Sequence, residues 1–349
     1  MIFVENENYN INDDTHYNMD KSAISLKNLC KLFQGVQAVD CVNLEIETGE
    51  LFGLLGPNGA GKSTIIKMLT TMLRPSSGTA SILGHDIIQE RDAVRSCIGV
   101  VFQDATLDKK LTGKENLDFH AQLYGLDRDV RRRRIDEILE LVDLRDKADV
   151  MVENYSGGMQ RRLAIARGLI HHPRVLFLDE PTLGLDAQTR RSIWEYIKEL
   201  NVREDMTIVL TTHYMEEADH LCKRVAIIDH GKIIALNSPQ ELKNSVGPDT
   251  IIMQIKYCNE LFLASLSSFS EIMAFDASEG QIVLQVDDAQ SRIPQVIIEA
   301  CMNRVTVISV RAVEPTLEDV FLKFTGRSIR EGENTGDLTT KKCLQRMGS

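Results

Sequence analysis

Short apolar runs and amphipathic stretches alternate along residues 23–240, and this alternation predicts the secondary structure. Strands are predicted where apolar and β-branched residues cluster, at 23–33, 42–50, 49–55, 79–84, 98–103, 174–180, 206–213 and 224–236. The first of them is expected to be an edge strand, and the last a hairpin that turns at Asp229-His230-Gly231. Apolar residues spaced i, i+3, i+4 predict helices between the strands. Such alternation indicates an α/β fold with a mostly parallel sheet.

Two segments depart from this pattern. Residues 104–172 carry mainly helical spacing and are predicted to form an inserted helical subdomain. After Gly247-Pro248, the order strand, helix, two strands, helix, strand predicts a small ferredoxin-like α+β domain, followed by a last helix. The predicted division is a disordered tail at 1–22, the α/β domain at 23–246, an accessory domain at 247–326 and a disordered tail at 327–349.

Charge and composition narrow the possible partners. The chain has 349 residues, a net charge of −11 and a pI near 5.3, without the basic footprint of a broad nucleic-acid binder. Four arginines at 131–134 are flanked by acids, which favours a solvated helix face. No apolar run approaches the roughly 18–20 residues that span a membrane, so no insertion is predicted. The seven cysteines form no C-x-x-C pair and are predicted to be reduced, mostly buried thiols of a cytosolic protein.

Residues 56–63, GPNGAGKS, form a glycine-rich segment between a predicted strand and a predicted helix. The run fits G-x-x-x-x-G-K-[ST], in which backbone N–H groups and a helix N-terminus surround phosphates. Lys62 is expected to reach the β- and γ-phosphates, and the Ser63 hydroxyl to bind Mg²⁺. The alternative is a glycine-rich turn with an unrelated lysine, which the strand–helix context disfavours. The predicted contacts are Gly56, Pro57, Asn58, Gly59, Ala60, Gly61, Lys62, Ser63 and Thr64.

Three predicted strands end in polar side chains that suit phosphate chemistry. Asp179 and Glu180 close VLFLDE at the sheet edge where ligands bind in open α/β folds. Asp179 is expected to hold Mg²⁺ through its water shell, and Glu180 to take a proton from the attacking water. His213, on a neighbouring strand, is expected to reach the γ-phosphate, and Gln103, ending IGVVFQ, to bind Mg²⁺ or orient water. Each alone also fits a structural role at a strand end.

A second segment, YSGGMQRRLAIARGL at 155–169, also begins with glycines before a helical pattern. Ser156 is expected to cap the helix, while Gly157 and Gly158 leave backbone N–H groups open to an anion. This is a second helix N-terminus suited to phosphate, without a lysine. An ordinary capped helix remains the alternative on these residues alone.

Six motifs in one order resemble an ABC-transporter ATPase over about residues 23–240. They are GPNGAGKS, Gln103, YSGGM, VLFLDEP, GLDA with Asp186, and His213. The signature departs from the commoner LSGGQ, and Phe33 stands where the family usually has an adenine-stacking tyrosine. The resemblance implies that Phe33 stacks on adenine with Val39 nearby. It also implies a head-to-tail dimer in which Ser156, Gly157 and Gly158 bind the γ-phosphate in trans and Asp186 lies on the loop that crosses the interface.

The C-terminal EPTLEDVFLKFTGR and the region around the signature resemble the daunorubicin-resistance type of exporter ATPase. The resemblance implies an enzyme that binds and hydrolyses ATP with Mg²⁺, with Glu180, His213 and Lys62 as catalytic residues. It would power export of a small drug-like or lipid-like molecule through a separate integral membrane permease, which Glu115 and Tyr124 are candidates to contact. A homodimer or heterodimer, cytoplasmic and peripheral on the inner face of the cell membrane, is expected. The alternative is a soluble ABC-type ATPase of translation or DNA repair.

Overall fold

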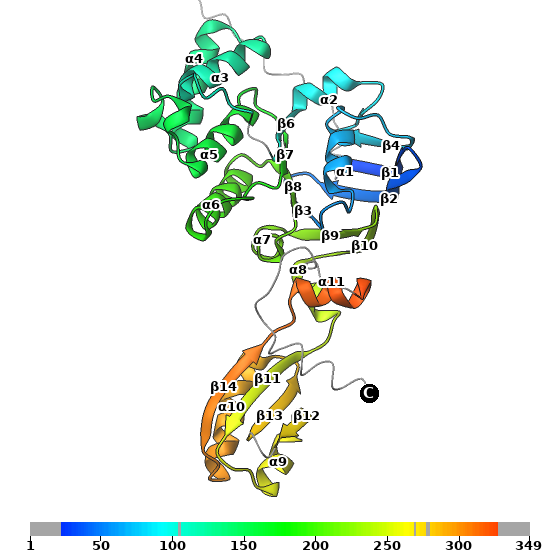
Figure 1. Cartoon of the computed structure of the whole chain (residues 1–349), viewed down its shortest axis with the longest axis vertical. Coiled ribbons are helices and arrows are strands. Elements are labelled where there is room, and N and C mark those ends of the chain that lie inside the picture. Colours follow the sequence, from blue (N-terminus) through cyan, green and yellow to red (C-terminus); the bar gives the residue numbers. More distant parts are fainter. Residues whose placement is uncertain (1–21, 104–105, 269, 277–279, 327–349) are drawn as a thin grey trace, which may run out of the picture.

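The structure, a computed structural model, describes residues 22–103, 106–268, 270–276 and 280–326. The tails predicted at 1–22 and 327–349 lie outside the described residues, except for Ser22, which begins the first strand. Figure 1 shows a larger α/β body and, below it, a smaller α+β domain.

The larger body contains a six-stranded sheet in the order β10-β9-β3-β8-β7-β6. Its strands are β3 (Leu51–Leu55), β6 (Ile98–Val101), β7 (Val175–Asp179), β8 (Thr207–Thr212), β9 (Arg224–Asp229) and β10 (Lys232–Asn237). All neighbours pair in parallel except β10, which is antiparallel to β9. The mostly parallel sheet is therefore confirmed. The predicted hairpin turns at His230 and Gly231, which both have positive φ, as a tight two-residue turn requires.

An antiparallel sheet in the order β2-β1-β4-β5 packs beside it, made of β1 (Ser22–Phe33), β2 (Val36–Glu47), β4 (Ser77–Ile82) and β5 (His85–Asp86). The expectation that β1 is an edge strand is wrong, because β1 pairs with both β2 and β4. Alternating burial along a strand reveals which face is covered but not how many neighbours it has.

Helices fill the space on both faces of the parallel sheet. They are α1 (Lys62–Leu69), α2 (Arg91–Cys97), α6 (Ala187–Arg203), α7 (Met215–Leu221) and α8 (Pro239–Asn244). The helical insert contains α3 (Gly113–Leu123), α4 (Arg128–Leu141), α5 (Gly157–Gly168) and the 3₁₀ turns Arg145–Lys147 and Val152–Asn154. Strand β7 is fully buried because successive side chains enter different cores. Leu176 and Leu178 join the core shared with the insert, whereas Val175 and Phe177 join the core shared with α1 and the antiparallel sheet.

The smaller domain has the predicted β-α-β-β-α-β order: β11 (Asp249–Ile255), α9 (Glu260–Leu266), β12 (Glu271–Asp276), β13 (Gln281–Val286), α10 (Ala289–Met302) and β14 (Val307–Val313). Its antiparallel sheet runs β12-β13-β11-β14, the ferredoxin-like order, over a core of its own.

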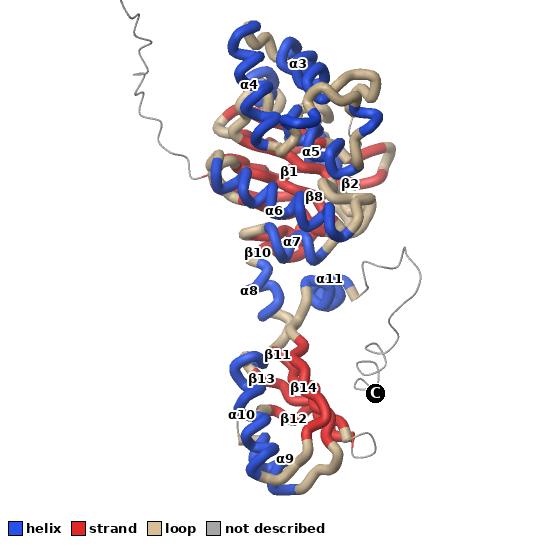
Figure 2. The backbone as a smooth tube through the Cα atoms, turned by 90° about the vertical axis from the view of Figure 1, so that its left-hand side faces the viewer, coloured by secondary structure: helices blue, strands red, loops and turns tan. Residues whose placement is uncertain are grey.

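The last helix, α11 (Leu317–Thr325), does not join this domain, although 247–326 was expected to form one unit. Its buried residues Leu317, Val320 and Phe321 belong to the core of the α/β body, and Lys323 Nζ donates to the Ser245 carbonyl after α8. Figure 2 shows α11 beside α8, where the chain has returned to the larger body. The spacing of apolar residues along α11 defines a face to bury but does not say which core receives it.

Candidate functional site

The glycine-rich segment lies where the buried strand β3 passes into α1, at the carboxyl end of the parallel sheet. Gly61 caps α1 with φ 108°, and a Cβ added there would lie 2.5 Å from the Ala38 carbonyl oxygen. A Cβ at Gly56 would lie 2.2 Å from the Ile228 carbonyl oxygen. Side chains at these two positions would collide with backbone, so glycine is required for the loop to pack this closely. The loop therefore has the tight wrap expected of a phosphate cradle.

Lys62 begins α1 and is buried, with 5% of its surface exposed. Its Nζ donates to the carbonyl oxygens of Gly56 at 2.7 Å and Pro57 at 3.1 Å, and lies 3.9 Å from Glu180 Oε1. Burial lowers the pKa of Lys62, and the charges of Glu180 and Asp179 oppose this shift. The ammonium group is thus held at the loop in contact with one of the predicted catalytic acids.

Asp179 ends β7 and lies against the start of α1. Ser63 Oγ donates to Asp179 Oδ1 at 3.1 Å, and the Thr211 hydroxyl of β8 donates to the same oxygen. A serine hydroxyl beside a carboxylate gives the hard oxygen ligands that Mg²⁺ prefers, so the pair fits a magnesium site. Thr211, which is opposite Asp179 in the parallel register, was not predicted. Its signal in the sequence is the change from apolar to polar residues within MTIVLTTH.

Glu180 follows Asp179 in a left-handed conformation, with φ 47°. Its N–H donates to the carbonyl oxygen and the hydroxyl of Thr211, which hold this strained turn in place. Glu180 Oε1 lies 3.3 Å from His213 Nδ1, as well as 3.9 Å from Lys62 Nζ. Contact with His213 is the largest cause that lowers the pKa of Glu180, and Lys62 adds to it. The structure thus brings Lys62, Ser63, Asp179, Glu180 and His213 together.

Three other predicted residues are placed less simply. Phe33 ends β1 with 43% of its surface exposed, and Lys31 Nζ lies 5.0 Å from the ring centroid. Val39 is completely buried and packs under Gly61, so it supports the loop from beneath and offers no surface to a base, contrary to expectation. Gln103 does not end a strand, because β6 ends at Val101; it is an exposed residue beside positions outside the described residues.

The signature segment opens α5, as predicted. Ser156 caps this helix by accepting the Met159 N–H at 3.3 Å, and Gly157 and Gly158 form its first turn. Asp186 is exposed and caps α6, where it accepts the Gln188 and Thr189 N–H groups. A Cβ at Gly158 would lie 2.6 Å from the Thr189 methyl, so the beginnings of α5 and α6 are packed side by side.

A buried network behind the site was missed entirely. Arg161 of α5, 6% exposed, donates to the carbonyl oxygens of Phe102 at 2.8 Å and Asp179 at 3.2 Å. Burial lowers the pKa of Arg161 to about 10, although the charges of Glu217 and Asp179 oppose it. Arg161 therefore ties the signature helix to the strand ends that precede Gln103 and Glu180.

Glu217 of α7 is the acid that faces this network. It is completely buried, and its Oε1 accepts hydrogen bonds from the Thr182 hydroxyl at 2.7 Å and from Trp194 Nε1 at 2.9 Å. A charged residue in the run HYMEEADH gives no sequence signal of burial, which depends on the tertiary partners.

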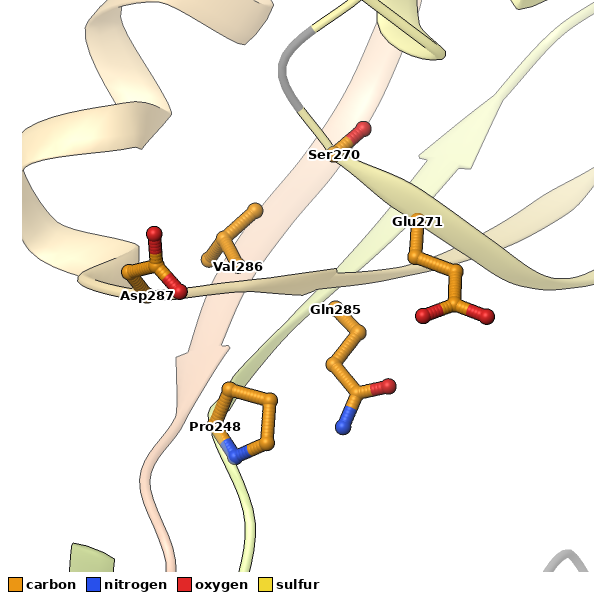
Figure 3. Close-up of a pocket in the computed structure, with 6 residues that line it drawn as sticks. All are labelled: Pro248, Ser270, Glu271, Gln285, Val286 and Asp287. Atoms are coloured by element: carbon orange, nitrogen blue, oxygen red, sulfur yellow. The ribbon is translucent and has the colours of Figure 1, made fainter.

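The smaller domain has a cavity of about 270 Å³ lined by the six residues that Figure 3 labels. Its polar groups include the Glu271 and Asp287 carboxylates and the Gln285 amide, and no cation lies among these six residues. Two carboxylates and no basic side chain among the six lining residues disfavour a phosphate ligand, so this cavity does not compete with the site on the parallel sheet.

Comparison with known proteins assigns both parts of the chain. The ABC transporter family model matches residues 39–183, and the model of the C-terminal domain of DrrA1-3-like ATP-binding proteins matches residues 238–325. The linearmycin resistance ATP-binding protein LnrL of Bacillus subtilis is 37% identical over 311 residues, covering 88% of this chain and all of that protein. The daunorubicin/doxorubicin resistance ATP-binding protein DrrA of Streptomyces peucetius is 38% identical, covering 87% of this chain and 92% of that protein.

The chain belongs to the ABC-transporter ATP-binding family. A further relative is the Nod factor export ATP-binding protein I of Sinorhizobium fredii, which is 38% identical and covers 92% of this chain and 91% of its own length. This membership confirms the predicted resemblance to the daunorubicin-resistance type. The chain is an ATP-binding and ATP-hydrolysing subunit that powers export through a separate membrane permease. A role as a soluble ATPase in translation or DNA repair is not favoured.

Solved ABC cassettes share the fold of the larger body. CbiO1 of Clostridium perfringens has a TM-score of 0.61 at 29% identity, covering 65% of this chain and 94% of that one. A dimeric post-hydrolysis cassette bound to ADP and Pi has a TM-score of 0.55 at 30% identity, covering 62% of this chain and 98% of that one. Within the described residues, no helix has the length and apolar character needed to cross a membrane.

Proposed function

We propose that two copies of this subunit, or one copy and a homologous partner, close on two ATP molecules and thereby drive export of a small drug-like or lipid-like molecule. The proposal rests above all on one observation: the Glu180 carboxylate lies between Lys62 and His213, one residue from Asp179. The names of the resistance and export relatives support the cargo class. The same relatives support a place for the subunit at the cytoplasmic face of the cell membrane.

Hydrolysis follows from this arrangement. Glu180 accepts a proton from the water that attacks the γ-phosphorus in line. Its lowered pKa keeps the Glu180 carboxylate ionised near neutral pH, so that its oxygens carry no proton before the attack. Lys62 releases the loop carbonyls and pairs with phosphate oxygens, while His213 donates a hydrogen bond toward the charge that develops on the phosphoryl group. The Glu180 N–H contacts with Thr211 keep the carboxylate in position during this step.

Ser63 and Asp179 would hold Mg²⁺, Asp179 through water, with Gln103 as a further ligand. The ion would supply positive charge to the β- and γ-phosphate oxygens. The exposed ring of Phe33 would stack on the adenine. In a head-to-tail pair, Ser156, Gly157 and Gly158 of one copy would contact the γ-phosphate on the other, with Asp186 at the interface. The exposure of Ser156, Gly157 and Asp186 supports this role.

The replacement Glu180→Gln tests the assigned base. The variant should bind ATP and lose turnover by about 10²-fold or more, because an amide cannot accept the proton. With ATP and Mg²⁺ it should accumulate as a closed dimer in size-exclusion chromatography with light scattering. The exposed Glu216→Gln on α7 is the matched control. Turnover at the wild-type level in Glu180→Gln would refute the assignment.

A further inference from the structure

Two thiols that ATP hydrolysis does not use meet on the antiparallel sheet. Cys30 lies on β1 and Cys41 on β2, and their Sγ atoms are 3.3 Å apart. In the part of the chain that the structure describes, they are the one pair of cysteine sulfurs in contact. Cys30 is 7% exposed, whereas Cys41 is exposed. Of the six cysteines that the structure describes, two are buried, Cys30 and Cys222, so the prediction of mostly buried thiols is wrong.

A β-bulge creates this contact. Leu29 pairs with Val42 and Lys31 with Val39, so β2 has one more residue than β1 between these pairs. Cys41 lies in the bulge with φ 50°, a backbone conformation that is uncommon for residues other than glycine. Its N–H donates to Cys30 Sγ at 3.1 Å. A bulge redirects a side chain locally, and this one directs both the N–H and the thiol of Cys41 toward Cys30.

The two sulfurs have different acidities because of these contacts. Hydrogen bonds from the Ser77 hydroxyl and from Cys41 lower the pKa of Cys30, while the contact with Cys30 raises the pKa of Cys41 to about 11. A thiol that ionises more readily, beside one that ionises less readily, provides the attacking and the resolving group of a reactive cysteine pair. The nearly buried position of Cys30 restricts the attacking reaction to a small oxidant.

We propose that Cys30 and Cys41 are a modification site at which hydrogen peroxide closes a reversible disulfide between β1 and β2. The Cys30 thiolate attacks one peroxide oxygen, which forms Cys30 sulfenic acid and releases hydroxide. The Cys41 sulfur then attacks the sulfenic sulfur, so that an S–S bond forms and water leaves with the Cys41 proton. A disulfide is about 2.05 Å long, so the sulfurs must approach by roughly 1 Å.

This movement occurs next to parts of the nucleotide site, and its effect on binding rests on the proposed function. Phe33 lies three residues after Cys30 on the same strand. Beside Cys41, the Asp40 N–H donates to the Gly231 carbonyl at 2.9 Å. The carbonyl of Ala38, two residues before Asp40, lies against Gly61 of the phosphate loop. Closing the disulfide therefore shifts the segment that supports the phosphate loop and carries the aromatic ring, and weakens nucleotide binding.

The first experiment tests the bond itself on the full chain. The reduced protein is treated with hydrogen peroxide, and peptides are mapped by mass spectrometry with and without a dithiol reductant. The wild type and the Cys97→Ser control should yield a reducible Cys30–Cys41 peptide, whereas Cys30→Ser and the exposed Cys41→Ser should not. Sulfinic acid at Cys30, or two intact thiols after treatment, would overturn the proposal.

The second experiment measures the affinity for ATP before and after oxidation. Oxidised wild type should bind about threefold or more weakly and recover after reduction. Cys30→Ser, which lacks the attacking thiol, should keep its affinity for ATP after treatment with peroxide. Equal affinity in a protein whose bond has formed would disprove the effect on binding. Failure of the reduced wild type to bind ATP would instead contradict the proposed function, and the mapping would still decide the disulfide.

Discussion

Removing the buried carboxylate of Glu217 should destabilise the larger body strongly. In Glu217→Ala, the Thr182 hydroxyl and the Trp194 N–H lose their acceptor, and each unsatisfied buried donor costs about 1–3 kcal/mol. Arg161 also loses the charge that most opposes the effect of its burial. The two donors that lose their acceptor together cost about 2–6 kcal/mol, so we expect a loss of this order. Glu217→Gln keeps an oxygen acceptor and should lose less, about 1–3 kcal/mol.

Trp194 makes this prediction easy to measure, because it is the one tryptophan in the chain and donates directly to Glu217. Its fluorescence should follow unfolding in urea, with the midpoint falling in the order wild type, Glu217→Gln, Glu217→Ala. The neighbouring Glu216 is exposed, so Glu216→Gln should match the wild type within about 0.5 kcal/mol. If Glu217→Ala were no less stable than Glu216→Gln, the buried network would not contribute as described.

Two further substitutions test other contacts. Thr211→Val removes the hydroxyl that contacts Asp179 and the Glu180 N–H, so ATP turnover should fall about 10-fold or more. The free energy of unfolding should change by less than about 2 kcal/mol. Unchanged turnover, measured by steady-state phosphate release, would rule out a positioning role for this hydroxyl. Phe321→Ala removes a fully buried side chain of α11 from the core of the larger body. The free energy of unfolding measured by Trp194 fluorescence should therefore fall by about 3–5 kcal/mol. An unchanged Trp194 transition would contradict the placement of α11 in this core.

The sequence predicted which polar residues meet beside the phosphate loop, because these residues follow buried strands. Parallel strands bring their carboxyl ends to one edge, so Asp179 and His213 were expected near the loop that carries Lys62. Their neighbours in the register could not be named, because strand order is set by the whole sheet. Thr211 therefore went unnoticed although it contacts both Asp179 and Glu180.

Where prediction failed, the missing information was tertiary. Val39 has the right chain position to approach a base, but packing under Gly61 removes it from the surface. The face of α11 was visible as a pattern, yet its partner lies on α7 and α8 of a different unit. From the sequence alone, Arg161 and Glu217 resemble charged residues of the protein surface. Only the fold shows that carbonyls, a hydroxyl and an indole N–H surround them.

The buried network also connects, within one chain, the signature segment and the strand end that carries Glu180. Glu217 holds Thr182, two residues after Glu180, and Arg161 holds the Asp179 carbonyl while it belongs to the helix that Ser156 caps. A movement of α5 would therefore act on the strand end that carries Glu180. Because these partners are buried, their hydrogen bonds are costly to break, so the strand end and the helix should move as one piece. Under the proposed function, this gives a physical route by which contact of Ser156, Gly157 and Gly158 with the nucleotide of a partner copy would influence the position of Glu180.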